Sequence, residues 1–134
     1  MFLIPRKTKQ NKVRKGRIQS YDHKARGLVL GRYGLIAIES AYLRASQLEA
    51  ARQTINRHLQ RIGRVWTTVF PDLGITKRPT QIRIGKGTGS TKYWAARIRC
   101  GRILFEVDGV PLKKAKEALK SGANKLPLKV LLLL

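Results

Sequence analysis

The clearest periodic pattern of apolar positions in the chain lies between Ser46 and Gly63. Apolar residues recur there at steps of three and four, so at 100° per residue they form one stripe along a helix. Ser46 and Glu49 have the spacing of a capping box, and Gly63 has the place of a C-terminal cap. We therefore predict a helix between these ends. Its buried stripe is Leu48, Ala51, Ile55, Leu59 and Ile62.

Short runs rich in β-branched and aromatic residues predict strands elsewhere. Residues 28–40 hold two such runs around a turn at 31–34, which indicates a strand pair. Further strands are expected at 64–70, 80–84, 93–99 and 102–107. Within these strands we assign Trp66, Phe70 and Phe105 to the core. Glu106 alternates with apolar neighbours and is expected to point outward.

A second helix is predicted after Pro111, a residue that is favoured at helix starts. Its inward positions are Leu112, Ala115, Ala118 and Leu119, and its outward positions are Lys113, Lys114, Lys116 and Lys120. Residues 125–134 are expected to form a final strand and tail. Several strands with two helices, outside strict βαβ alternation, predict an α+β domain with a mostly antiparallel sheet.

The net charge of the chain indicates what kind of partner it binds. The 134 residues include 29 Lys and Arg but only 7 Asp and Glu, a formal net charge of +22. A chain of this length is expected to form one domain, and such a charge calls for a polyanionic partner. Among polyanionic partners we expect nucleic acid first and an anionic membrane surface second. No membrane insertion is expected, because the longest apolar run, residues 130–134, is far too short to span a bilayer.

The positive charge is concentrated at the N-terminus, and we divide the chain into a basic RNA-binding arm, residues 1–27, and a single α+β domain, residues 28–134. A transit peptide is the alternative for this segment, but its scarce serines favour an arm. The cations expected to bind RNA there are Arg6, Lys7, Lys9, Lys12, Arg14, Lys15 and Arg17. Arg57, Arg61 and Arg64 are expected on the polar face of the first helix, where their guanidinium forks suit phosphate.

A glycine-rich segment at residues 84–92 resembles a phosphate-binding loop but fails two tests. The second glycine of a Walker loop and the third glycine of a dinucleotide fingerprint are both missing. Alternating glycines between strand-like runs instead predict a projecting hairpin loop, residues 76–92, that RNA backbone can approach closely. The residues expected there are Lys77, Arg78, Arg83, Gly85, Lys86, Gly87, Gly89 and Lys92.

Catalytic groups are scarce. His23 and His58 are isolated, Asp72 and Asp108 belong to turns, and Cys100 has no evident base partner. The single cysteine also excludes an internal disulfide, and no ligand cluster predicts a metal or another cofactor. We expect no enzyme. A free-standing basic nucleic-acid-binding protein, such as a chromatin factor or RNA chaperone, and a nucleotide-dependent enzyme stay open as alternatives.

Together these motifs resemble the bacterial type of large-subunit ribosomal protein sixteen, a family of bacteria and organelles. The resemblance runs from about Pro5 to Lys129. Its most specific blocks are EAAR at 49–52, RVW and VFPD within 64–72, RIGKGTG at 83–89 and FEVDGV at 105–110.

The resemblance implies a hammerhead-like α+β fold bound to large-subunit ribosomal RNA, between the central protuberance and the stalk base. It also implies neighbouring ribosomal proteins and tRNA as partners, because the family's loop at 83–89 points toward the peptidyl transferase centre. Residues 18–30 and 130–134 depart from the common bacterial pattern, and Thr88 stands where lysine is frequent. We therefore expect a mitochondrial matrix ribosome, with a plastid or bacterial ribosome as the alternatives.

Overall fold

The computed structural model describes residues 4–10, 12–18, 20–22, 27–83, 85 and 87–134. His23, Ile84 and Lys86, singled out above, lie outside these residues. The elements in chain order are β1 (Tyr33–Ala37), β2 (Ala41–Arg44), α1 (Ala45–His58), β3 (Arg64–Thr67), β4 (Leu73–Lys77), β5 (Ser90–Ile98), β6 (Ile103–Asp108), α2 (Leu112–Ala123) and β7 (Val130–Leu133).

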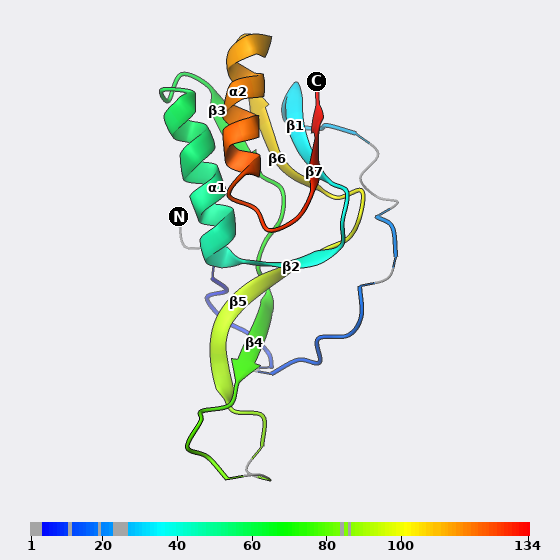
Figure 1. The fold of residues 1–134 in the computed structure, drawn as a ribbon, viewed down its shortest axis with the longest axis vertical. Helices are drawn as coiled ribbons and strands as arrows, with labels where there is room; N and C mark the ends of the chain where they lie inside the picture. Colours follow the sequence, from blue (N-terminus) through cyan, green and yellow to red (C-terminus); the bar gives the residue numbers. More distant parts are fainter. Residues whose placement is uncertain (1–3, 11, 19, 23–26, 84, 86) are drawn as a thin grey trace.

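The strands form two antiparallel sheets. The larger has the order β3-β6-β1-β7, and the smaller has the order β2-β5-β4. The helices α1 and α2 lie side by side against the larger sheet, and the β4–β5 hairpin extends away from it at the other end of the molecule (Figure 1). The predicted α+β class with antiparallel sheets and two packed helices is confirmed.

Helix α1 buries four of its five predicted stripe residues, Leu48, Ala51, Ile55 and Leu59. Ile62 was assigned wrongly, because the helix ends at His58 and leaves this side chain 66% exposed. The chain turns out of the helix at Gln60 and Arg61, whose φ angles are 52° and 63°.

The predicted helix caps were also wrong. Gln47, not Glu49, closes the N-terminus: its Oε1 accepts the backbone N–H of Arg44 at 3.0 Å. Gly63 is not the C-cap. A Cβ there would lie 2.8 Å from the carbonyl oxygen of Asp108 and from Val110, so this glycine allows two chain segments to approach closely.

The predicted strand pair at 28–40 contains only one strand, β1. The segment before it crosses the larger sheet instead, and Glu106 holds it there: one carboxylate oxygen accepts the backbone N–H groups of Val29, Leu30 and Gly31 at 3.0, 2.6 and 2.9 Å. The expected outward position of Glu106 was therefore wrong, since this residue is only 2% exposed. Gly31 fits this crossing because a Cβ would meet the Val107 carbonyl at 2.7 Å.

Some of the other strand predictions agree with the structure and some do not. β5 and β6 appear as expected, whereas residues 80–83 form no strand and the strand β4 was not predicted. Phe105 is fully buried, but Phe70 is 49% exposed and Trp66 only half-buried.

Helix α2 begins after Pro111, as predicted, and buries Ala115, Ala118 and Leu119. Leu112 was assigned inward wrongly, because it lies in the first turn and is 50% exposed. Gly122 sets the distance between the helices, since a Cβ there would lie 2.4 Å from Cγ1 of Ile55. Among the described residues, no helix has the length and apolar composition needed to cross a membrane.

Candidate nucleic-acid interface

The basic arm has no helix or strand in its described residues, but two contacts fasten it to the domain. The Tyr42 hydroxyl donates to the carbonyl oxygens of Lys15 and Gly16, at 3.1 and 2.8 Å. Further along, Asp22 donates its backbone N–H to the Cys100 carbonyl at 2.8 Å, and its carboxylate pairs with Arg102 at 3.1 Å. No local sequence pattern predicts these contacts, because the two partners of each contact lie far apart in the chain.

All seven predicted arm cations are described and exposed. Fastened at Lys15, Gly16 and Asp22, the arm presents them along an extended path beside the domain (Figure 1). Exposed, closely spaced cations on an extended chain are suited to phosphate contacts.

The three arginines predicted for one helical face do not share it. Arg57 and Arg61 line a common shallow cleft of about 350 Å³ at the end of α1, together with Gln53, Asn56 and Gln60. Arg64 lies in β3 and lines a different groove, with Ile62 and Trp66. Because α1 ends at His58, Arg64 lies outside the helix and cannot share its polar face with Arg57.

The predicted glycine-rich loop joins β4 to β5 and is the part of the molecule that projects furthest from the helices (Figure 1). Gly85, Gly87 and Gly89 have φ angles of 92°, 86° and 78°, which other residues rarely adopt. A Cβ on Gly89 would lie 2.6 Å from the Lys77 carbonyl, so this glycine closes the neck of the loop. Gly85 and Gly87 have open space around them.

The loop carries its cations at two levels. At the base, Lys77, Arg78 and Lys92 line a groove of about 290 Å³. The guanidinium of Arg78 also donates to the Arg83 carbonyl, which braces the loop internally. The Arg83 side chain is exposed. Cations and accessible backbone are therefore both available on this hairpin.

A small apolar cluster supports the hairpin. Leu73, Ile75 and Ala95 are buried, and Tyr42 and Tyr93 pack against them. The guanidinium carbon of Arg44 lies 4.6 Å from the centre of the Tyr93 ring, a cation–π distance. The sequence pattern did not predict this cluster, because it did not predict β4.

Glu49 and Arg52 form the one described ion pair with two short contacts. Arg52 donates to both carboxylate oxygens, at 2.9 and 2.6 Å. These hydrogen bonds hold the pKa of Glu49 below its ordinary value, and the same contact raises the pKa of Arg52. The Glu49 carboxylate is therefore engaged by Arg52 within α1.

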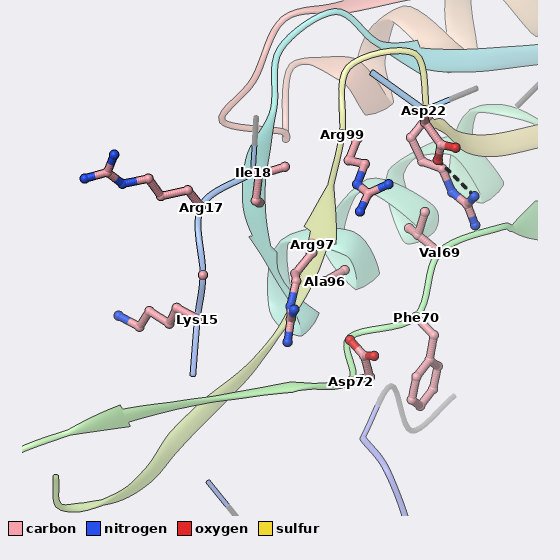
Figure 2. Close-up of a pocket in the computed structure, with 12 residues that line it drawn as sticks. Lys15, Arg17, Ile18, Asp22, Val69, Phe70, Asp72, Ala96, Arg97 and Arg99 are labelled. Atoms are coloured by element: carbon pink, nitrogen blue, oxygen red, sulfur yellow. Dashed lines mark hydrogen bonds and ion pairs between the residues drawn. The ribbon is translucent and has the colours of Figure 1, made fainter. Parts of the chain in front are cut away.

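Three arginines outside the predicted set line a cleft of about 490 Å³ between the arm, β5 and residues 69–72. The side chains of Arg97 and Arg99 extend into the space between the arm and residues 69–72, whereas Lys15 and Arg17 extend away from it (Figure 2). Arg102 lies beside them, paired with Asp22. The sequence signal was the spacing RIR at 97–99, which places two cations on one side of a strand.

The described residues contain no group of three or more His, Cys, Asp or Glu side chains arranged to hold a metal ion. Cys100 lies in the turn between β5 and β6, where its backbone N–H donates to the Ser40 hydroxyl at 3.0 Å. What the described surface offers is cations and clefts suited to a polyanion.

Comparison with known proteins agrees with this surface. Residues 5–133 match the family described as ribosomal protein L16p/L10e. The chain is 50% identical over 128 residues to the large ribosomal subunit protein uL16 of Parvibaculum lavamentivorans, covering 96% of this chain and 92% of the relative. The protein of the same name from Bartonella bacilliformis is 52% identical, covering 96% and 93%.

Proposed function

Because this chain belongs to the ribosomal protein L16p/L10e family, we propose that its arm and exposed arginines bind large-subunit ribosomal RNA and that its β4–β5 loop lies beside tRNA. Membership itself makes the chain a structural constituent of the large ribosomal subunit and not an enzyme. Its partners are ribosomal RNA and ribosomal proteins. The observation that carries this conclusion is a family match from residue 5 to residue 133, which includes both the arm and the loop.

The proposed ribosomal-RNA contacts are phosphate contacts. They rest on the exposed cations of the arm, residues 1–27, and on exposed arginines of the domain, residues 28–134. On the arm these are Arg6, Lys7, Lys9, Lys12, Arg14, Lys15 and Arg17. On the domain they are Arg57 and Arg61, which share one cleft, and Arg64, which lies in another groove.

The proposed tRNA contact is made by the loop at 76–92. Lys77, Arg78 and Lys92 supply charge at its base, and Arg83 and Lys86 add two cations in the middle of its sequence. Gly85 and Gly87 carry no side chain and have open space around them, so nucleic-acid backbone can approach the chain there. The loop positions tRNA, and the residues of this chain perform no chemistry.

We further propose a mitochondrial ribosome as the location. The support is the sequence of residues 18–30 and 130–134, which departs from the common bacterial pattern, together with the strongly basic composition. The relatives compared above are bacterial and fit a bacterial or organellar ribosome equally.

Sedimentation of a source extract in moderate salt tests the role and the location together. We expect the chain in equal amount with large ribosomal subunits, and in subunits purified from mitochondria. A broad soluble or DNA-bound distribution would contradict the ribosomal role. Recovery only with ribosomes of another compartment would contradict the mitochondrial proposal alone.

The cleft at the end of α1 gives a sharper test of the phosphate contacts. Changing Arg57 and Arg61 together to Gln should flatten the dependence of RNA affinity on salt, because each lost phosphate contact reduces the slope of log K against log salt by about 0.7 to 0.9. The matched control is Lys113 and Lys114 changed to Gln, which removes two charges from the exposed face of α2. Equal slopes for both variants would show that the arginines are only solvated.

A further inference from the structure

The cleft between the arm, β5 and residues 69–72 contains two cations that pair with no residue in the described part of the chain. Arg97 and Arg99 extend into this cleft (Figure 2), and neither guanidinium has an ion pair or hydrogen bond to any described residue. Arg102 differs, because its charge is matched by Asp22 at 3.1 Å. Asp72 is then the one carboxylate left in the cleft against two guanidinium groups, which leaves the cleft positively charged.

The position of Arg99 is fixed by the turn that carries it. The Arg99 carbonyl accepts the backbone N–H of Arg102 at 3.1 Å, and Gly101 donates to the Ala37 carbonyl at 2.7 Å. The arm closes over the same turn through the contact of Asp22 with Cys100. The backbone around the cleft is thus held in place before any ligand arrives, which lowers the cost of ordering it on binding.

An exposed aromatic ring lies at the same cleft. Phe70 is 49% exposed, although its neighbours Val69 and Pro71 are buried and hold the backbone in place. An exposed ring on the wall of a cleft that arginines also line can stack an unpaired base while the arginines bind its phosphate.

We propose that this cleft binds one unpaired nucleotide of ribosomal RNA, with its phosphate on Arg97 and Arg99 and its base stacked on Phe70. The inference rests on the proposed function, since it places one specific RNA contact within it. A regular duplex does not fit, because its bases are stacked inside the helix and cannot reach a side chain in a cleft of about 490 Å³. An unpaired nucleotide offers both its phosphate and its base.

Binding of the full chain to large-subunit ribosomal RNA tests this site with three variants. Arg97 and Arg99 changed together to Gln should weaken binding at least about tenfold more than the charge-matched control, Lys113 and Lys116 changed to Gln. Phe70→Leu, which keeps an apolar side chain, should weaken binding about 5- to 160-fold, the range that corresponds to loss of one base–aromatic stack. Phe70→Tyr keeps the ring and should bind like the unchanged chain.

Ultraviolet cross-linking in native large subunits locates the nucleotide. Trypsin cleaves after Arg64 and Lys77, so the peptide 65–77 should carry one cross-linked nucleotide, and chemical probing should show that nucleotide to be unpaired. Thermal unfolding of each variant identifies any loss of binding that comes from misfolding, and the Phe70→Tyr result provides a folded comparison at the same position.

The outcomes separate the two claims. If the unchanged chain binds ribosomal RNA but the arginine variant equals its lysine control, or Phe70→Leu equals Phe70→Tyr, this site is wrong and the ribosomal role stands. A cross-linked nucleotide within a regular helix would also overturn the site. If the unchanged chain binds ribosomal RNA no better than an unrelated RNA, the proposed function fails and this inference fails with it.

Discussion

The two sheets of this protein are built for different tasks. In the larger sheet the central strand β6 is buried at every position from Ile103 to Val107, because α1 and α2 cover one face and the segment before β1 crosses the other. In the smaller sheet, Leu43, Ala96 and Ile98 pack into the main core at the end next to α1. Further along the hairpin the buried apolar cluster is small, formed by Leu73, Ile75 and Ala95, and the hairpin beyond it carries exposed cations.

This difference separates stability from recognition. Apolar burial, the main stabilising contribution in folding, is concentrated between the helices and the larger sheet. The hairpin needs only enough packing to hold its base. Its end is then available for nucleic acid, with glycines at 85 and 87 in place of bulky side chains.

Large-to-small substitutions in the two apolar clusters should have the largest effects on the free energy of unfolding. Leu59→Ala removes a side chain that is 1% exposed in the main core, and we expect a loss of about 2 to 5 kcal/mol in the free energy of unfolding. Leu73→Ala, equally buried in the hairpin cluster, should fall at the lower end of that range and loosen β4 and β5 more than the helices. Denaturant unfolding with hydrogen exchange measures both. A loss below about 0.5 kcal/mol for Leu59→Ala would show that α1 does not pack as described.

Glu106→Gln should give the next largest effect. The change replaces the carboxylate that holds three backbone N–H groups, and hydrogen bonds to charged groups contribute about 1.5 to 3 kcal/mol. Glu117→Gln on the exposed face of α2 is the control and should change stability by less than about 0.5 kcal/mol. Hydrogen exchange should also quicken at residues 29–31. Unchanged exchange there would contradict the anchoring role of Glu106.

The smallest expected effect is the pH dependence of the Glu49–Arg52 pair. Because the pKa of Glu49 is lowered in the folded chain, its contribution is fully present above its ordinary value of 4.5 and is lost as the pH falls through the lowered value. For a pair on a helix surface we expect about 0.3 to 0.5 kcal/mol. The measurement compares unfolding of the unchanged chain and Glu49→Gln at neutral and acid pH. A difference that stays constant across this range would contradict the pair.

The sequence predicted the features that depend on neighbouring residues and did not predict those that depend on contacts between distant segments. Leu48, Ala51, Ile55 and Leu59 were predicted because their spacing alone reports the buried face of α1. Glu106 was not, because the alternation of a strand predicts an outward side chain and carries no sign that another segment will cover that face.

The same difference between local and long-range interactions applies to the candidate binding sites. The glycine pattern at 85–89 indicated a projecting loop, because positive φ angles and turns are local properties. The cleft at Arg97 and Arg99 required knowledge of where the arm is fastened, and that depends on Tyr42 and Asp22, which contact residues far away in the sequence. Phe70 was misplaced for a related reason: its run is typical of a buried strand, but β3 ends at Thr67.

The proposed division between a stabilising core and a loop that contacts tRNA is tested most directly by tRNA accommodation on purified ribosomes carrying Arg83→Ala with Lys86→Ala. The matched control is Lys113→Ala with Lys114→Ala on α2, which removes the same charge far from the loop. We predict normal assembly for both variants and slower accommodation for the loop variant alone, with peptide transfer reduced but not abolished, because in the proposed role the loop positions tRNA and performs no chemistry. Accommodation at the unchanged rate by fully assembled loop-variant ribosomes would contradict the account.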